Sequence, residues 1–130
     1  MEHAEAGIAE MLSIIRESGQ GSFLAVLKTH GEDKTPGVMS FCTAGAGVSL
    51  ALDFANRGKK TLELLERLDQ CVINHHGRNY IAKDGHMSAD TFQKTYPQWN
   101  KLEKLRDPLM TSSFWTRTTA PLQGKDHVIS

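Results

Sequence analysis

Apolar residues recur with a helical period at two places in the chain. In Glu2–Ser18 and in Leu62–Ile73 they are spaced three and four residues apart, with charged residues between them. Glycines follow the first pattern, and the run His75-His76-Gly77 follows the second. We expect the glycine of that run to take the left-handed conformation that closes a helix. The pattern therefore predicts two amphipathic helices.

Shorter segments with a period of two predict β-strands. The alternation is clearest after residue 47, where large apolar residues point one way and Ser49, Ala51 and Asp53 point the other. Loops rich in glycine and polar residues separate the segments, including a flexible turn at residues 44–47. We expect strands over four ranges: Phe23–Thr29, Met39–Thr43, Val48–Phe54 and Asn79–Ala82.

Helical patterns return in the last third of the chain. Ser88 is placed to cap a helix that runs to Tyr96, and a further helical pattern covers Trp99–Leu105. No periodicity follows residue 121. We therefore expect one domain over residues 1–121 and a flexible tail over residues 122–130.

This order of elements predicts an α+β fold, in which an antiparallel sheet carries amphipathic helices mainly on one face. The other face then meets solvent or a ligand. Lys28 shares one side of its strand with neighbouring apolar residues, while Ser49, Ala51 and Asp53 form the small and polar side of theirs. We expect these side chains on the face that the helices leave bare.

Composition narrows the classes of function. The chain has 130 residues, 15 basic and 15 acidic side chains, an apolar share of 39% and a mean hydropathy of -0.38. Balanced charge favours neither nucleic acid nor an anionic membrane, and no apolar run is long enough to span a bilayer. We expect no secretion signal in these residues, and we expect Cys42 and Cys71 to be buried thiols rather than a disulfide. Both expectations favour the cytoplasm.

Several familiar catalytic or binding motifs are not found. His75 and His76 are adjacent and diverge, and we find no acid or cysteine at a helical spacing that completes a set with them and His86, so we expect no metal site. The glycines of residues 45–47 do not open a helix, which makes a hairpin turn the expectation rather than a phosphate loop. Cys42 lacks the surroundings of a catalytic cysteine, and no motif supports a stand-alone enzyme with a lysine or histidine base.

Four residues remain as candidates for a site: Lys28, Asp53, Tyr80 and Lys83. Taken alone, each has an ordinary interpretation that is as good as a functional one. Lys28, Asp53 and Lys83 could be surface charges, and Tyr80 could be a core tyrosine. All four fall in or beside predicted strands of one sheet, so together they indicate a polar site on that sheet. A lysine ammonium held there is a compact charge that can bind an anionic or polarised group.

A family resemblance rests on several segments spread in order along the chain: Ser22–Lys28, Gly31, Leu50–Phe54, Gly77–Arg78, Tyr80–Asp84, Phe92, Tyr96–Pro97 and Asp107–Pro108. They resemble the C-terminal part of FAD-linked oxidoreductases of the vanillyl-alcohol oxidase type, nearest to the branch of aldonolactone and sugar oxidases and decaprenylphosphoryl-ribose oxidase. The resemblance covers roughly residues 5–117, and the Tyr-x-Ala-Lys-Asp segment is its most specific piece.

The resemblance implies a place for each candidate residue. In that family a flavin domain comes first, and a cap domain with an antiparallel sheet covers the isoalloxazine ring; this chain is similar to the back half of the cap plus the C-terminal helices. Lys83 would be the catalytic lysine near the flavin and the oxidised hydroxyl, and Tyr80 would line the same cavity. Lys28 and Asp53 would bind substrate from the sheet face.

Two positions depart from the family pattern. Ala51 stands where the decaprenylphosphoryl-ribose oxidase branch has a cysteine, which points to a different substrate. The closing Ser-Asp-x-x-Arg-Arg pattern is reduced to Ser113–Arg117 without its acid. The usual packing of the C-terminus is therefore not implied.

The implied reaction is oxidation of a hydroxyl of a sugar, polyol or lactone by hydride transfer to flavin. We find no pyrophosphate-binding glycines, so we expect the FAD-binding domain to be absent from this chain. The chain, as a fragment or a split subunit, is then expected to be inactive without a flavin-binding domain or subunit. The alternative is a non-catalytic binding or homo-oligomerisation module that uses the exposed sheet face.

Overall fold

A two-stranded antiparallel hairpin and five α-helices form the fold in the computed structural model, which describes residues 2–32, 37–42, 45–83 and 85–122. The elements are α1 (Glu2–Ser18), β1 (Ser22–His30), β2 (Gly47–Phe54), α2 (Lys59–Asn74), the 3₁₀ turn η1 (Ile81–Lys83), α3 (Ala89–Thr95), α4 (Trp99–Glu103) and α5 (Ser113–Thr118). This mixture of helices with an antiparallel sheet is compatible with the predicted α+β class. Within the described residues, no helix is both long and apolar enough to cross a membrane.

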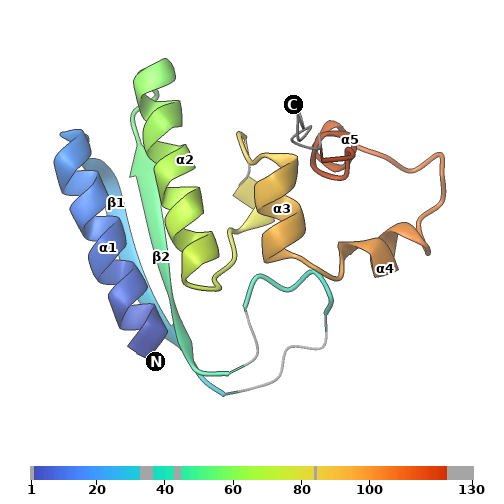
Figure 1. Cartoon of the computed structure of the whole chain (residues 1–130), viewed down its shortest axis with the longest axis horizontal. Helices are drawn as coiled ribbons and strands as arrows, with labels where there is room; N and C mark the ends of the chain where they lie inside the picture. Colours follow the sequence, from blue (N-terminus) through green and yellow to red (C-terminus); the bar gives the residue numbers. More distant parts are fainter. Residues whose placement is uncertain (1, 33–36, 43–44, 84, 123–130) are drawn as a thin grey trace, which may run out of the picture.

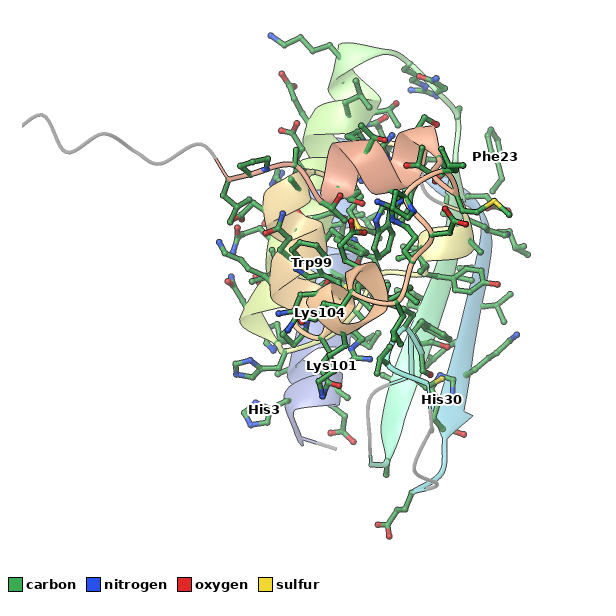
Figure 2. All side chains as sticks on the ribbon, turned by 90° about the vertical axis from the view of Figure 1, so that its right-hand side faces the viewer. His3, Phe23, His30, Trp99, Lys101 and Lys104 are labelled. Carbon is green, nitrogen blue, oxygen red and sulfur yellow. The ribbon has the colours of Figure 1, made fainter. Side chains whose placement is uncertain are left out.

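The first two helices cover one face of the hairpin. Helices α1 and α2 lie side by side (Figure 1), and Figure 2 shows both of them on the same side of the two strands. Their amphipathic patterns explain this arrangement, because α2 buries Leu64, Leu68 and Cys71 while all of its charged residues except Asp69 are exposed. An ion pair of 2.8 Å between Arg67 and Glu17 joins the two helices at the surface.

The register of the hairpin decides which strand residues share a face. Lys28 pairs with Ser49, Val26 with Ala51, and Leu24 with Asp53. Residues directly opposite one another share a face, as do alternate residues along one strand. The register therefore places Lys28 and Asp53 on the same face of the hairpin.

Helix α2 ends in a left-handed turn, but the residue that adopts it is not the expected glycine. His76 has φ 56°, and the Gly77 N–H donates to the Val72 carbonyl at 2.8 Å while the His76 N–H donates to Ile73. This is the hydrogen-bond pattern of a Schellman motif. A side chain at Gly77 would approach Val72 Cγ1 to 3.1 Å. Glycine is needed here for the close approach of two backbone segments.

Two of the four predicted strands are wrong. Residues 39–42 form turns and bends, and Thr43 lies outside the described residues. Residues 79–80 are irregular and lead into η1. The backbone of this region is held by side chains from elsewhere, as described below, and not by a neighbouring strand. The predicted turn at residues 44–47 begins outside the described residues, and so does most of the predicted tail, residues 123–130.

An aromatic cluster forms a hydrophobic core under α3 and α5. Met87, Phe92 and Tyr96 are buried, and Phe114 and Trp115 pack against them. The Ser88 hydroxyl accepts a hydrogen bond from the Thr91 N–H at 3.1 Å, so the predicted helix cap is confirmed. Helix α5 was not predicted as a separate helix, because its six residues are too few to show a clear period.

The carboxylate of Glu103 is expected to make the stability of the fold depend on pH in the acidic range. Hydrogen bonds from Arg106 and from the Trp115 indole lower the pKa of Glu103 to about 2. A group whose pKa is depressed by folding stabilises the fold above its unfolded pKa, and this contribution is lost as the pH falls toward the folded value. We expect Glu103→Gln to lower the melting temperature near neutral pH, and the gap to wild type to close as the pH falls from about 5 to about 2.

Circular dichroism melts across that pH range test this expectation. Glu66→Gln, which removes an exposed carboxylate of α2, is the control and should change little. A gap between wild type and Glu103→Gln that stays constant over the whole range would contradict the assignment.

Candidate functional site

A cavity of about 410 Å³ lies where the first two helices, the loop end of the hairpin and the segment after α2 meet. Its walls come from the N-terminal half of α1, the C-terminal half of α2, and the strand ends around His30 and Ser49. Figure 2 shows His3 and His30, both wall residues, at the same end of the molecule. Residues 77–80 and Lys83 also line it, together with Phe41, Cys42, His86 and Met87.

Hydrogen bonds to three other parts of the fold hold residues 77–83, which we call the strap. Beyond the turn at Gly77, the Arg78 guanidinium donates to the Ser40 carbonyl. The Asn79 side chain donates to Asp69 of α2, and the Tyr96 hydroxyl donates to the Asn79 carbonyl. The strap therefore has a defined path without belonging to a sheet, and this path positions the side chains that follow.

Tyr80 and Lys83, two of the predicted site residues, both line the cavity. Tyr80 is 53% exposed, and its ring packs edge-on against Phe41 with 5.3 Å between centroids. Lys83 ends η1, where its backbone N–H lies 3.4 Å from the Tyr80 carbonyl, and its side chain is exposed. The tight turn brings a phenol and an ammonium group to the same wall.

His30 adds a polar atom that the sequence did not indicate. Its ring packs against Phe41, and its Nδ1 lies 3.7 Å from the Cys42 thiol. Its Nε2 is buried with no hydrogen-bond partner among the described residues. A buried polar atom without a partner is costly, and a polar group of a ligand in this cavity would relieve that cost. A lone histidine at a strand end carried no sequence signal for this role.

Lys28 and Asp53 lie outside the cavity lining. Both are exposed on the hairpin, and Lys28 is directly opposite Ser49, which does line the cavity. Asp53 is four residues further along β2, or about 13 Å at the usual rise of a strand. The fold thus brings Tyr80 and Lys83 together, sets Lys28 at the rim and leaves Asp53 at the far end of the same face. Their roles remain predictions.

Tyr96 has a structural role beneath the strap. Burial raises the pKa of Tyr96 to about 12, although the nearby Arg78 guanidinium acts in the opposite direction. Its proton is therefore retained at any ordinary pH and stays in the hydrogen bond to Asn79. The hydrogen bond from the Tyr96 hydroxyl to the strap is therefore retained across the ordinary pH range.

A second group of reactive side chains lies where α1 meets the end of α2. One ligand atom each from Glu10, Cys71 and His75 lies within 4.8 Å of the others. Burial, followed by the charge of Glu10, raises the pKa of the Cys71 thiol to about 11. The expectation that no acid or cysteine stands at a helical spacing from the histidines at the end of α2 is wrong for Cys71, which is one helical turn before His75. Glu10 is brought in only by the packing of two helices.

Neither cysteine forms a disulfide, as predicted. Cys71 is buried, whereas Cys42 is only half-buried beside His30.

Comparison with known proteins shows a partial similarity to a flavoenzyme. No family model matches the chain. The chain is 35% identical over 98 residues to decaprenylphosphoryl-β-D-ribose oxidase of Mycolicibacterium smegmatis, and the match covers 72% of this chain. The chain spans about a fifth of that curated relative, since the match covers 20% of its length. This similarity supports the relationship to the FAD-linked oxidases that the sequence motifs indicate.

Proposed function

We propose that this chain is the substrate-covering portion of an FAD-dependent oxidoreductase. The complete oxidoreductase oxidises a hydroxyl of a sugar, polyol or lactone in the cytoplasm. The chain takes part in this reaction only together with a flavin-binding domain or subunit. The observation that carries the proposal is the cavity wall formed by Tyr80 and Lys83. These residues belong to the most specific segment of the family resemblance, and the similarity to decaprenylphosphoryl-β-D-ribose oxidase agrees with it.

The described residues fit the substrate side of a flavin site. The cavity offers the Lys83 ammonium, the Tyr80 phenol and the buried His30 Nε2, which are groups that bind hydroxyls. The sequence offers no glycine-rich loop for a pyrophosphate, so the main hold on FAD is assigned to the partner domain. When bound, FAD supplies the acceptor for the substrate hydride.

Lys83 and Tyr80 have distinct parts in the proposed reaction. In the oxidation of an alcohol, the hydroxyl would give its proton to solvent and its carbon would give a hydride to the bound flavin, while the C=O bond forms. Negative charge develops on the oxygen during this change, and a fixed cation beside that oxygen stabilises it. Lys83 provides this cation. Tyr80 and His30 orient the substrate, and the helices α1 and α2 close the wall behind it.

The hairpin offers a surface for the flavin-binding partner. Phe23, Leu24 and Leu27 of β1 are 80%, 52% and 58% exposed. Figure 2 shows Phe23 pointing away from the body of the molecule. A hairpin of two strands is marginal on its own and gains stability from further partners. The same exposed strand also supports the second candidate function, a binding or homo-oligomerisation module without catalysis.

Reconstitution tests the proposed function. The chain is combined with a flavin-binding domain of the FAD-linked oxidases, either as a separate polypeptide or fused to it in one reading frame. We expect the combination to retain a yellow flavin and to reduce an artificial electron acceptor with a sugar, polyol or lactone, and the flavin-binding part alone to show no such activity. Full activity of the flavin-binding part without this chain would contradict the proposal. A dimer of this chain in light scattering, with no effect on flavin activity, would favour the second candidate.

A further inference from the structure

The cluster at the α1–α2 contact combines three side chains of different chemistry. Cys71 lies in the last turn of α2, and His75, four residues later, is its C-cap residue, so their side chains lie on the same side of the helix end. Glu10 reaches them from α1, and its Oε2 lies 2.7 Å from His75 Nε2. No ligand is needed to hold this geometry, because both helices belong to the folded core.

The two helices approach closely at this point. A side chain at Gly7 would come within 3.1 Å of His75 Cγ, and the Cys71 thiol donates to the Gly7 carbonyl at 3.7 Å. The backbone of α1 packs directly against both residues. The backbone at Gly7 therefore restricts the positions of the thiol and the imidazole on one side. Both side chains line the cavity described above.

We propose that Glu10, Cys71 and His75 bind a Zn²⁺ ion that clasps α1 to α2. Sulfur, imidazole nitrogen and carboxylate oxygen are the ligands that zinc takes in proteins. Ligand atoms around tetrahedral zinc are separated by about 3.3–3.6 Å. The Glu10 and His75 atoms, now 2.7 Å apart, would open by roughly 0.6 Å, and ligand atoms as far apart as 4.8 Å would close by roughly 1 Å. The softer thiolate and imidazole select against Mg²⁺ and Ca²⁺.

Exposure and charge both suit a bound ion. The side chains of Glu10 and His75 are 46% and 22% exposed, which leaves a path for the ion, while Cys71 is only 2% exposed. On binding, the Cys71 thiol gives its proton to solvent, and the resulting thiolate and the Glu10 carboxylate together neutralise Zn²⁺. Three protein ligands leave a fourth position for water.

Direct titration of the full chain with zinc tests the proposal. After treatment with a chelator and a reductant, ZnCl₂ is added in a calorimeter, and we expect one ion per chain and a higher melting temperature. CoCl₂ is the optical probe, because a thiolate ligand gives a cobalt charge-transfer band. Absence of stoichiometric zinc binding, or tighter binding of Mg²⁺, would overturn the proposal.

Matched variants identify the ligands. We expect Glu10→Gln, Cys71→Ala and His75→Gln each to weaken zinc binding at least about tenfold. Each variant has a matched control, whose zinc affinity should stay within about twofold of wild type. The controls are Glu17→Gln on α1, Cys42→Ala for the other thiol and His76→Gln for the next histidine. Glu10→Gln changes an exposed side chain, so it remains informative if Cys71→Ala does not fold. Equal losses in variants and controls would show an unspecific effect and reject these ligands.

Discussion

Substitution of Lys83 by methionine is expected to lower the rate of substrate oxidation by about 10²–10³-fold in the reconstituted flavin complex. The side chain ends η1 on the cavity wall, next to Tyr80, and it is exposed rather than committed to a buried contact. Methionine has a similar length but no charge, so it removes the proposed stabilisation of negative charge on the substrate oxygen. Steady-state kinetics with an artificial electron acceptor measure the effect.

Two further substitutions separate a catalytic effect from a general one. Lys83→Arg keeps the charge but spreads it over a planar group, so it should recover only part of the rate. Lys104→Met removes a charge at the end of α4, which contributes nothing to the cavity lining and lies on the opposite side of the molecule from α1 (Figure 1), and should leave the rate unchanged. If Lys83→Met retains the wild-type rate with an unchanged melting temperature, Lys83 has no part in the reaction.

Replacement of Phe92 by alanine is expected to destabilise the fold by about 3–5 kcal/mol. Its side chain is fully buried, and its ring lies 5.4 Å from those of Tyr96 and Phe114 and 5.9 Å from that of Trp115. The substitution removes this apolar area from the core and leaves a cavity between three aromatic rings. Urea unfolding, followed by circular dichroism, measures the loss.

The same substitution should also reach the functional site. Tyr96 stacks on Phe92 and holds the strap through Asn79, so a loosened Tyr96 releases the residues that position Tyr80 and Lys83. Leu109→Ala is the control, because Leu109 is 91% exposed and its removal should cost less than about 0.5 kcal/mol. A loss below about 1 kcal/mol for Phe92→Ala would mean that the aromatic cluster is not a core.

The local elements were accessible from the sequence because their signals are local. The helix over Glu2–Ser18 has the predicted bounds, and α2 extends the predicted Leu62–Ile73 segment at both ends. The strand that begins at Gly47 follows from strict alternation, and the Ser88 cap follows from one hydroxyl before a helical run. In each case a few neighbouring residues suffice to favour one backbone conformation.

The strap could not be predicted in the same way. Its short apolar run is typical of a strand, but its conformation depends on Asp69, Ser40 and Tyr96, which are up to 38 residues away in sequence. Long-range hydrogen bonds override the local preference for an extended strand. The left-handed residue at the end of α2 is His76 rather than the expected Gly77, which packs closely on Val72.

Residue types and family motifs in the sequence were enough to single out Lys83 and Tyr80, and hairpin pairing was enough to set Lys28 and Asp53 on one face. The path of the strap decided which of these residues line the cavity. It placed Tyr80 and Lys83 on the cavity wall, whereas Asp53 lies outside the lining. The Glu10–Cys71–His75 cluster depended on packing still more, because Glu10 is 61 residues from Cys71. Periodicity along a chain reports which side of an element is buried, whereas the meeting of side chains from separate elements is set by how those elements pack.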